Sequence, residues 1–210
     1  MKGKKSNVFI YMILTILAVV FLAPIFIILF NSFKGKLYIS DAPFKLPTAE
    51  TFSGLQNYID GLSKTGFLSA FGWSIFITFF STIVIVLFTA MTGWYITRSK
   101  TKVSTSLYFI FVFSMIVPFQ MVMFTMSKVA NMLNLDNPVG LIVLYIGFGA
   151  GLSIFMFSGF VKSIPIDIEE AALIDGCNPI KTFFLIVLPL LKPICITVAI
   201  LNVMWIWNDY

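Results

Sequence analysis

The sequence alternates long apolar runs with short polar intervals. About 20 apolar residues are enough to cross the hydrocarbon core of a bilayer, and five runs reach that length: residues 8–30, 67–96, 107–126, 139–161 and 183–207. We therefore predict an all-α polytopic membrane protein, with the whole chain, residues 1–210, forming a single transmembrane domain.

Prolines and glycines modify the regular pattern of these runs. Pro189 and Pro193 remove backbone donors near the start of the last run, which predicts a bend there. Pro118 lies near the middle of the third run. Gly147 and Gly151 have the four-residue spacing that lets two membrane helices approach closely.

Composition supports a membrane protein and excludes several other classes. Hydrophobic residues make up 59% of the chain and charged residues 11%, which lies outside ordinary soluble composition. The chain has no histidine, and Cys177 and Cys195 lack metal-ligand spacing, so neither a metal site nor a disulfide framework is predicted. The net charge of +5 is dispersed around the ends of the runs, so we expect no nucleic-acid partner.

The interval 162–182 carries four carboxylates, so it must face water or another protein. Ser163 and Pro165 are typical of a helix start, and Gly176 is typical of a left-handed stop. Asn178 and Pro179 favour a second helix start. We predict two short helices with a break, the first presenting a small, mildly apolar face ringed by acids.

A spaced motif begins inside this interval. Glu170-Ala171-Ala172 is followed after three residues by Gly176, and after nine more by Ile186-Val187-Leu188-Pro189. This pattern resembles the EAA signature of binding-protein-dependent ABC importer permeases. The surrounding sequence, with Trp207-Asn208-Asp209 near the end of the chain, resembles that of MalG-like carbohydrate permease subunits. From helical periodicity alone, an amphipathic loop at the membrane surface remains the alternative.

The resemblance implies a type I ABC importer permease fold, in which this loop is a cytoplasmic coupling helix that docks on an ATPase. It places the ATPase-coupling role on Glu169, Glu170, Ala171, Ala172, Asp175 and Gly176. It also implies three protein partners, which are a second permease subunit, an ABC ATPase dimer and an extracellular solute-binding protein. The substrate that it implies is a sugar. ATP and magnesium would be bound by the ATPase and no cofactor by this chain.

The distribution of basic residues predicts the orientation. With a cytoplasmic N-terminus, eight lysines and arginines lie inside and five outside: Lys2, Lys4, Lys5, Arg98, Lys100, Lys102, Lys162 and Lys181 against Lys34, Lys36, Lys45, Lys64 and Lys128. This bias is the usual one for short cytoplasmic loops. We expect a multi-pass protein of the bacterial inner membrane, surrounded by lipid, with residues 31–66 outside as a loop or small cap.

The source of energy must be a partner. The chain has no phosphate-binding loop for ATP, and no run carries an acid in its interior that could couple transport to protons. No catalytic residue is predicted, so the chain is not expected to be an enzyme. Gln120, Asn202 and Ser153 are candidates for a sugar pathway, although hydrogen bonding between helices explains each of them as well.

Other functions fit the same topology less closely. Within the importer class, the solute could instead be an amino acid, a peptide or another small molecule. A secondary transporter lacks the intramembrane acid that it would need, and an intramembrane enzyme lacks a nucleophile motif. Because five spans from a cytoplasmic start leave the C-terminus outside, we expect the natural chain to continue into a sixth span.

Overall fold

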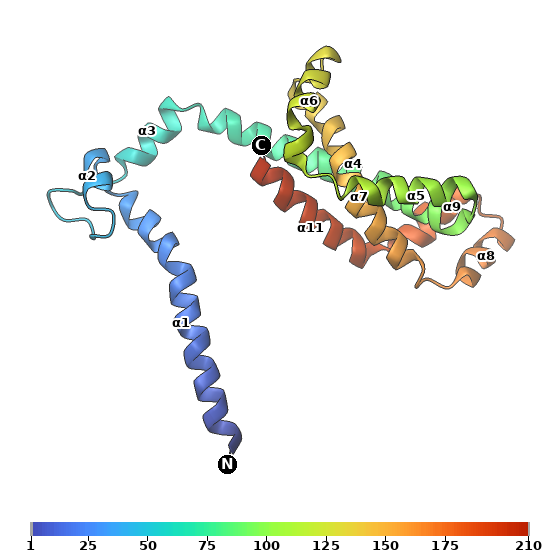
Figure 1. Ribbon diagram of the computed structural model, residues 1–210, viewed down its shortest axis with the longest axis horizontal. Coiled ribbons are helices and arrows are strands. Elements are labelled where there is room, and N and C mark those ends of the chain that lie inside the picture. The colour runs from blue at the N-terminus through green and yellow to red at the C-terminus, as the bar shows by residue number, and fades with distance from the viewer. Residues whose placement is uncertain (1, 210) are drawn as a thin grey trace. The chain divides into compact units, whose positions relative to one another are not determined.

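A computed structural model describes the backbone of residues 2–209 and the side chains of residues 8–209 (Figure 1). The predicted lysines Lys2, Lys4 and Lys5 and the final Tyr210 lie outside the described side chains. The described residues are mostly helical: α1 Lys2–Asn31, α2 Lys36–Asp41, α3 Gln56–Lys64, α4 Phe67–Ser99, α5 Lys102–Ser114, α6 Phe119–Met132, α7 Pro138–Val161, α8 Ile166–Ile174, α9 Pro179–Thr182, the π-helix η1 Phe183–Val187, α10 Leu188–Leu190 and α11 Lys192–Asp209.

The chain divides into two compact units, Met1–Ala70 and Phe71–Tyr210. In the first unit, α1 carries an apolar stretch, Val8–Asn31, whose large side chains are exposed along its length. An apolar helix with no buried face is suited to lipid rather than to water.

Residues 31–66 form a small ordered cap rather than an open loop. The side chain of Asn57 in α3 donates hydrogen bonds to the backbone carbonyls of Ser32 and Lys34, at 2.8 and 2.7 Å. Lys34 is buried, and its Nζ donates to Asn31 Oδ1 and to the carbonyl of Ala42, both at 2.8 Å. Because a buried ammonium group needs such acceptors, these polar contacts fix the cap to the end of α1.

Helices α4, α7 and α11 supply the core of the second unit. Small residues allow them to approach one another: a Cβ added at Gly93 of α4 would lie 2.8 Å from Phe157 Cβ in α7. At Gly149 of α7, an added Cβ would lie 2.7 Å from Asn202 Oδ1 in α11. The neighbouring side chains therefore leave no space for a methyl group at either position.

The five predicted spans correspond to three long helices and two bent helix pairs. Val8–Asn31, Phe67–Ser99 and Pro138–Val161 are long and apolar enough to cross a membrane as single helices. The third and fifth predicted runs are each broken. α5 and α6 meet at 104° around Pro118, and Pro179–Leu190 meets α11 at 77°. The bend predicted from Pro189 and Pro193 is thus confirmed, whereas the run 107–126 is not one continuous helix.

The glycine pair predicted in α7 divides into one packed and one open position. A Cβ at Gly151 would lie 2.7 Å from Ser114 Oγ and 2.8 Å from the carbonyl oxygen of Phe111, both in α5. A Cβ at Gly147 would have no heavy atom within 4 Å. Close approach to α5 therefore depends on Gly151, whereas Gly147 packs against no helix among the described residues.

Candidate coupling site

The polar segment after α7 folds as the short helix α8. Pro165 occupies its N-cap position with φ −57°, a value that the proline ring favours. The helix is followed by Gly176, whose φ of +83° lies in the left-handed region that glycine adopts readily. The amides of Gly176 and Cys177 donate to the carbonyls of Leu173 and Ala172. The predicted helix and its glycine stop are confirmed.

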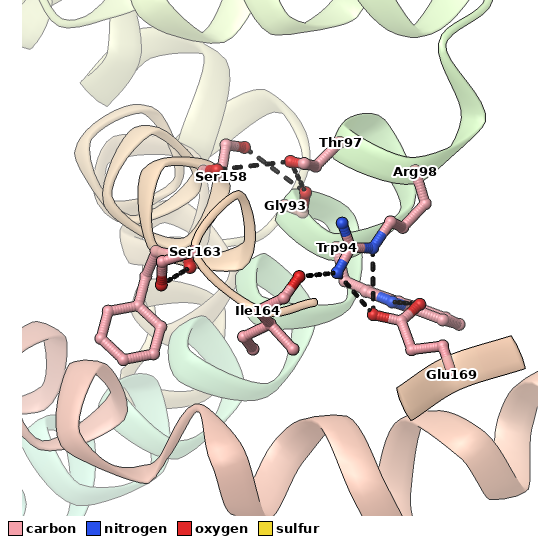
Figure 2. Close-up of polar contacts among 9 residues, drawn as sticks. Gly93, Trp94, Thr97, Arg98, Ser158, Ser163, Ile164 and Glu169 are labelled. Atoms are coloured by element: carbon pink, nitrogen blue, oxygen red, sulfur yellow. Dashed lines mark hydrogen bonds and ion pairs between the residues drawn. The ribbon is translucent and has the colours of Figure 1, made fainter. Parts of the chain in front are cut away.

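Glu169 is the buried acid of α8, with 7% of its surface exposed. Its Oε1 accepts hydrogen bonds from Nε and Nη2 of Arg98, at 3.0 and 2.8 Å, and its Oε2 accepts one from Trp94 Nε1 at 2.9 Å (Figure 2). Arg98 Nη2 also donates to the carbonyl of Ile164 at 2.9 Å. We call these four residues, Trp94, Arg98, Ile164 and Glu169, the Glu169 clamp.

The clamp joins α8 to the end of α4. Trp94 and Arg98 lie four residues apart, so their side chains project from one face of the helix. A carboxylate held by both an arginine fork and an indole N–H is well compensated for leaving water. Arg98 also holds the backbone just before α8, so a single guanidinium fixes both the start and the middle of this segment.

The remaining predicted coupling residues divide by exposure. Ala172 is buried with the core, and the others are exposed: Glu170, Ala171, Asp175 and Gly176. Ile174 projects beside them with 87% of its surface exposed. This outer face of α8 can offer carboxylates to a cationic partner and apolar area to a cleft. The ATPase-coupling role of these residues stays a prediction.

The chain beyond α8 returns to the core through α9 and η1. Asn178 Oδ1 accepts a hydrogen bond from the backbone N–H of Lys181 at 2.9 Å, and Pro179 is the first residue of α9, as predicted. Phe183 is fully enclosed, with its ring 5.5 Å from that of Trp94. The same tryptophan therefore contacts both α8 and the start of the segment that leads into α11.

The three predicted pathway residues do not form one group. Asn202 Nδ2 donates to Ser153 Oγ at 3.2 Å and to the carbonyl of Val198 at 2.8 Å. Asn202 also lines a cavity of about 300 Å³ with Ser114, whereas Gln120 is exposed on α6 and does not line it. Within residues 2–209, no three side chains of metal-ligating type are grouped to hold a metal ion.

Comparison with known proteins assigns the family. The sequence profile of the family described as "Binding-protein-dependent transport system inner membrane component" matches residues 86–210, which include the clamp and the spaced motif. The chain belongs to this family. The chain is also 39% identical over 195 residues to the "Probable starch degradation products transport system permease protein AmyC" of Thermoanaerobacterium thermosulfurigenes, an alignment covering 93% of this chain and 70% of that protein.

A second relative and a solved structure agree with this assignment. The permease is 34% identical to the "Multiple sugar-binding transport system permease protein MsmG" of Streptococcus mutans, over all of this chain and 76% of that one. Its fold matches, with a TM-score of 0.82 and 24% identity, a crystal structure of a bacterial ABC transporter involved in the import of the acidic polysaccharide alginate. That match covers 100% of this chain and 73% of the other, and the fold is that of an ABC importer permease.

The sequence did not predict that two side chains of this permease, Trp94 and Arg98, contact Glu169. Arg98 was interpreted only as a cytoplasmic marker and Trp94 only as an interfacial aromatic. Their spacing of four residues near a helix end was the available signal, because an arginine in the last turn is free to reach a neighbouring carboxylate. Nothing in the sequence paired that arginine with Glu169 rather than with any other acid of the loop.

Proposed function

We propose that this permease is one transmembrane subunit of an ATP-driven importer of carbohydrates, and that α8 transmits movement of an ATPase dimer to the spans. The observation that carries the proposal is the two-sided character of α8. Glu169 on one side is tied to α4, while Glu170 on the other is exposed and unpaired within the described residues. A helix fixed in this way can move with its spans when a partner pushes on its outer face.

The partners and the orientation are part of the same proposal. The ATPase would bind ATP and magnesium, and this subunit would contribute no catalytic residue. A second permease subunit would complete the pathway, and an extracellular binding protein would deliver the solute on the side of the cap. These roles require a cytoplasmic N-terminus in a bacterial inner membrane, which the distribution of basic residues supports.

A carbohydrate solute is supported by the two relatives, whose names refer to starch degradation products and to multiple sugars. The cavity beside Asn202 is consistent with such a solute, because it combines the amide of Asn202, the hydroxyl of Ser114 and the rings of Phe148 and Trp205. Sugars are bound by hydrogen-bonding groups together with aromatic faces. Ser153 would then orient the Asn202 amide from behind.

Docking is tested by replacing Glu170 and comparing it with a matched acid of the same helix. Loss of one partner of a charged pair at a buried contact typically costs about 2–5 kcal/mol. Glu170→Ala should therefore reduce the ATPase that co-purifies with the permease, and Asp167→Ala, which removes the same charge from an exposed position, should reduce it less. Equal retention of the ATPase by the wild type and Glu170→Ala would overturn the coupling role.

The solute is tested separately by uptake. Cells that lack the gene should lose import of one labelled oligosaccharide, and the wild-type gene, but not Glu170→Ala, should restore it. Selective loss of an amino acid or peptide would keep the coupling role and reject the carbohydrate. Collapse of uptake when the proton gradient is dissipated at constant ATP would favour a secondary transporter instead.

A further inference from the structure

A polar cavity of about 290 Å³ lies where α4 ends, α5 begins and α7 ends. It is separate from the cavity beside Asn202, with which it shares no lining residue. Its polar lining consists of two lysines and four hydroxyl-bearing residues: Lys100, Lys162, Thr97, Thr105, Tyr108 and Ser158. None of the residues that line it is acidic, so the cavity has a positive charge and many donors.

Among the described residues, the two lysines have no acidic partner. Lys162 Nζ lies 5.9 Å from the centre of the Tyr108 ring, which draws the ammonium toward the cavity wall. Neither Lys100 nor Lys162 forms an ion pair with any side chain described for residues 8–209. The nearest acid along the chain, Asp167, is exposed and forms no ion pair within the described residues, and Glu169 is already held by Arg98. The positive charge of this cavity is therefore available to a ligand.

Two of the four hydroxyl groups, those of Thr97 and Ser158, lie at the contact between α4 and α7. Thr97 Oγ1 donates to the carbonyl of Gly93 at 2.7 Å, and Ser158 Oγ makes a long contact of 3.4 Å with the same oxygen (Figure 2). A distance of 3.4 Å makes the bond from the Ser158 hydroxyl a weak one.

An apolar groove continues from this cavity along α5. Phe109 lines both the polar cavity and a second cavity of about 430 Å³. The other residues that line the second cavity are all apolar: Ile110, Val112 and Phe113 of α5, and Ile116 just after the end of that helix. Phe109, Ile110 and Phe113 are each more than 60% exposed. A cationic, hydroxyl-lined pocket that opens onto an apolar groove matches a ligand with an anionic head and a hydrocarbon tail.

We propose that this pair of cavities binds an anionic phospholipid, with the phosphate between Lys100 and Lys162 and an acyl chain along α5. Basic pockets between membrane helices are suited to anionic headgroups. A zwitterionic headgroup would bring its own ammonium group to the two lysines, so a phosphatidylcholine should bind less tightly. Lys162 directly precedes the loop that leads to α8, so the bound phosphate would lie next to the coupling segment.

The test measures lipid binding to the purified full importer complex by native mass spectrometry, with phosphatidylglycerol and phosphatidylcholine as the probes. The wild type should retain phosphatidylglycerol selectively. Each lysine near an anionic surface should contribute about fivefold to affinity, so Lys100→Gln and Lys162→Gln should each weaken binding by about that factor. Replacing both by arginine preserves the charge and should preserve binding, which separates loss of the ligand site from loss of the fold.

Lys102→Gln is the matched control, because Lys102 is exposed at the same turn and does not line the cavity. An equal loss in this control would overturn the site, since it would indicate general attraction to the basic turn. Equal retention of phosphatidylcholine, or no loss in the two lysine variants, would also overturn it. Displacement of the lipid by millimolar inorganic phosphate would assign the pocket to a soluble phosphate rather than to a lipid. Uptake is not measured, so the result is independent of the solute and of the coupling proposal.

Discussion

Replacing Arg98 by alanine tests the Glu169 clamp directly. The variant leaves the Glu169 carboxylate buried with the Trp94 N–H as its remaining clamp donor. Breaking a buried ion pair from one side typically costs about 3–5 kcal/mol. The Arg98 side chain is 19% exposed, so water can enter and replace part of the lost interaction. We therefore expect a local cost of about 2–4 kcal/mol.

Backbone hydrogen exchange across α8 measures this cost where it arises. Each 1.4 kcal/mol is a factor of ten in an equilibrium, so the opening of α8 in Arg98→Ala should become about 30- to 700-fold more favourable. Peptides from α8 of the purified complex should lose protection accordingly, whereas peptides from the middle of α7 should not. Glu169→Gln, which keeps the side-chain shape, should also lower protection, because an amide cannot replace the charge.

The exposed ion pair between Lys64 and Asp60 is the internal control for this experiment. Its two atoms are 3.0 Å apart, close to the 2.8 Å of the Arg98–Glu169 pair, but its side chains are 71% and 40% exposed. Exposed pairs contribute little, so Asp60→Asn should barely change exchange in α3. Unchanged protection of α8 in Arg98→Ala would refute the clamp, because the same distance would then have the same small effect at both sites.

Three further predictions concern other parts of the permease. Gly151→Ala should destabilise the purified protein by about 1–3 kcal/mol through overpacking against α5, and thermal unfolding should show no such loss for Gly147→Ala, where space is open. Asn57→Ala should destabilise the cap by about 1–3 kcal/mol, because it removes two hydrogen bonds to backbone carbonyls. Faster limited proteolysis of residues 31–66 would measure this loss. Hydrogen bonds from Lys64 and then Gln56 lower the pKa of Asp60. The ionised Asp60 therefore stabilises α3 above the pKa that this group has in the unfolded chain, and this stabilisation is lost as the pH falls through the lowered pKa. Acid should weaken α3 in the wild type more than in Asp60→Asn.

Much of this fold could be predicted from local patterns. The apolar runs 8–30, 67–96 and 139–161 lie within the helices α1, α4 and α7. The runs 67–96 and 139–161 contain no proline, and Pro24 in the run 8–30 does not end α1. Gly176 and the Asn178-Pro179 pair were predictable because turn and cap positions depend on a residue's own backbone preferences. Such local signals do not depend on contacts with residues that are distant in the sequence.

Features that depend on distant contacts were not predictable in the same way. Gly147 and Gly151 have the same spacing and the same residue type, yet only Gly151 faces α5. Pro118 lies inside the third run, but its position alone does not predict the 104° between α5 and α6. The sequence predicts either a loop or a small cap for residues 31–66 and does not decide between them, because the buried Lys34 is recognisable only when its acceptors are placed around it.

The sequence motif does not distinguish the two adjacent glutamates, Glu169 and Glu170, but their positions in the structure do. Neighbouring residues on an α-helix point about 100° apart, so burying Glu169 turns Glu170 toward the surface. The motif alone groups both acids as coupling residues, but their different surroundings predict different effects when each is replaced. Glu169 is neutralised within the chain, so replacing it should loosen α8 whether or not a partner is bound. Glu170 has no such partner within the described residues, so replacing it should leave exchange in the free permease unchanged and weaken only docking. If both variants failed in both assays, the division of roles between the two acids would be wrong, and α8 would have to act through its fold as a whole.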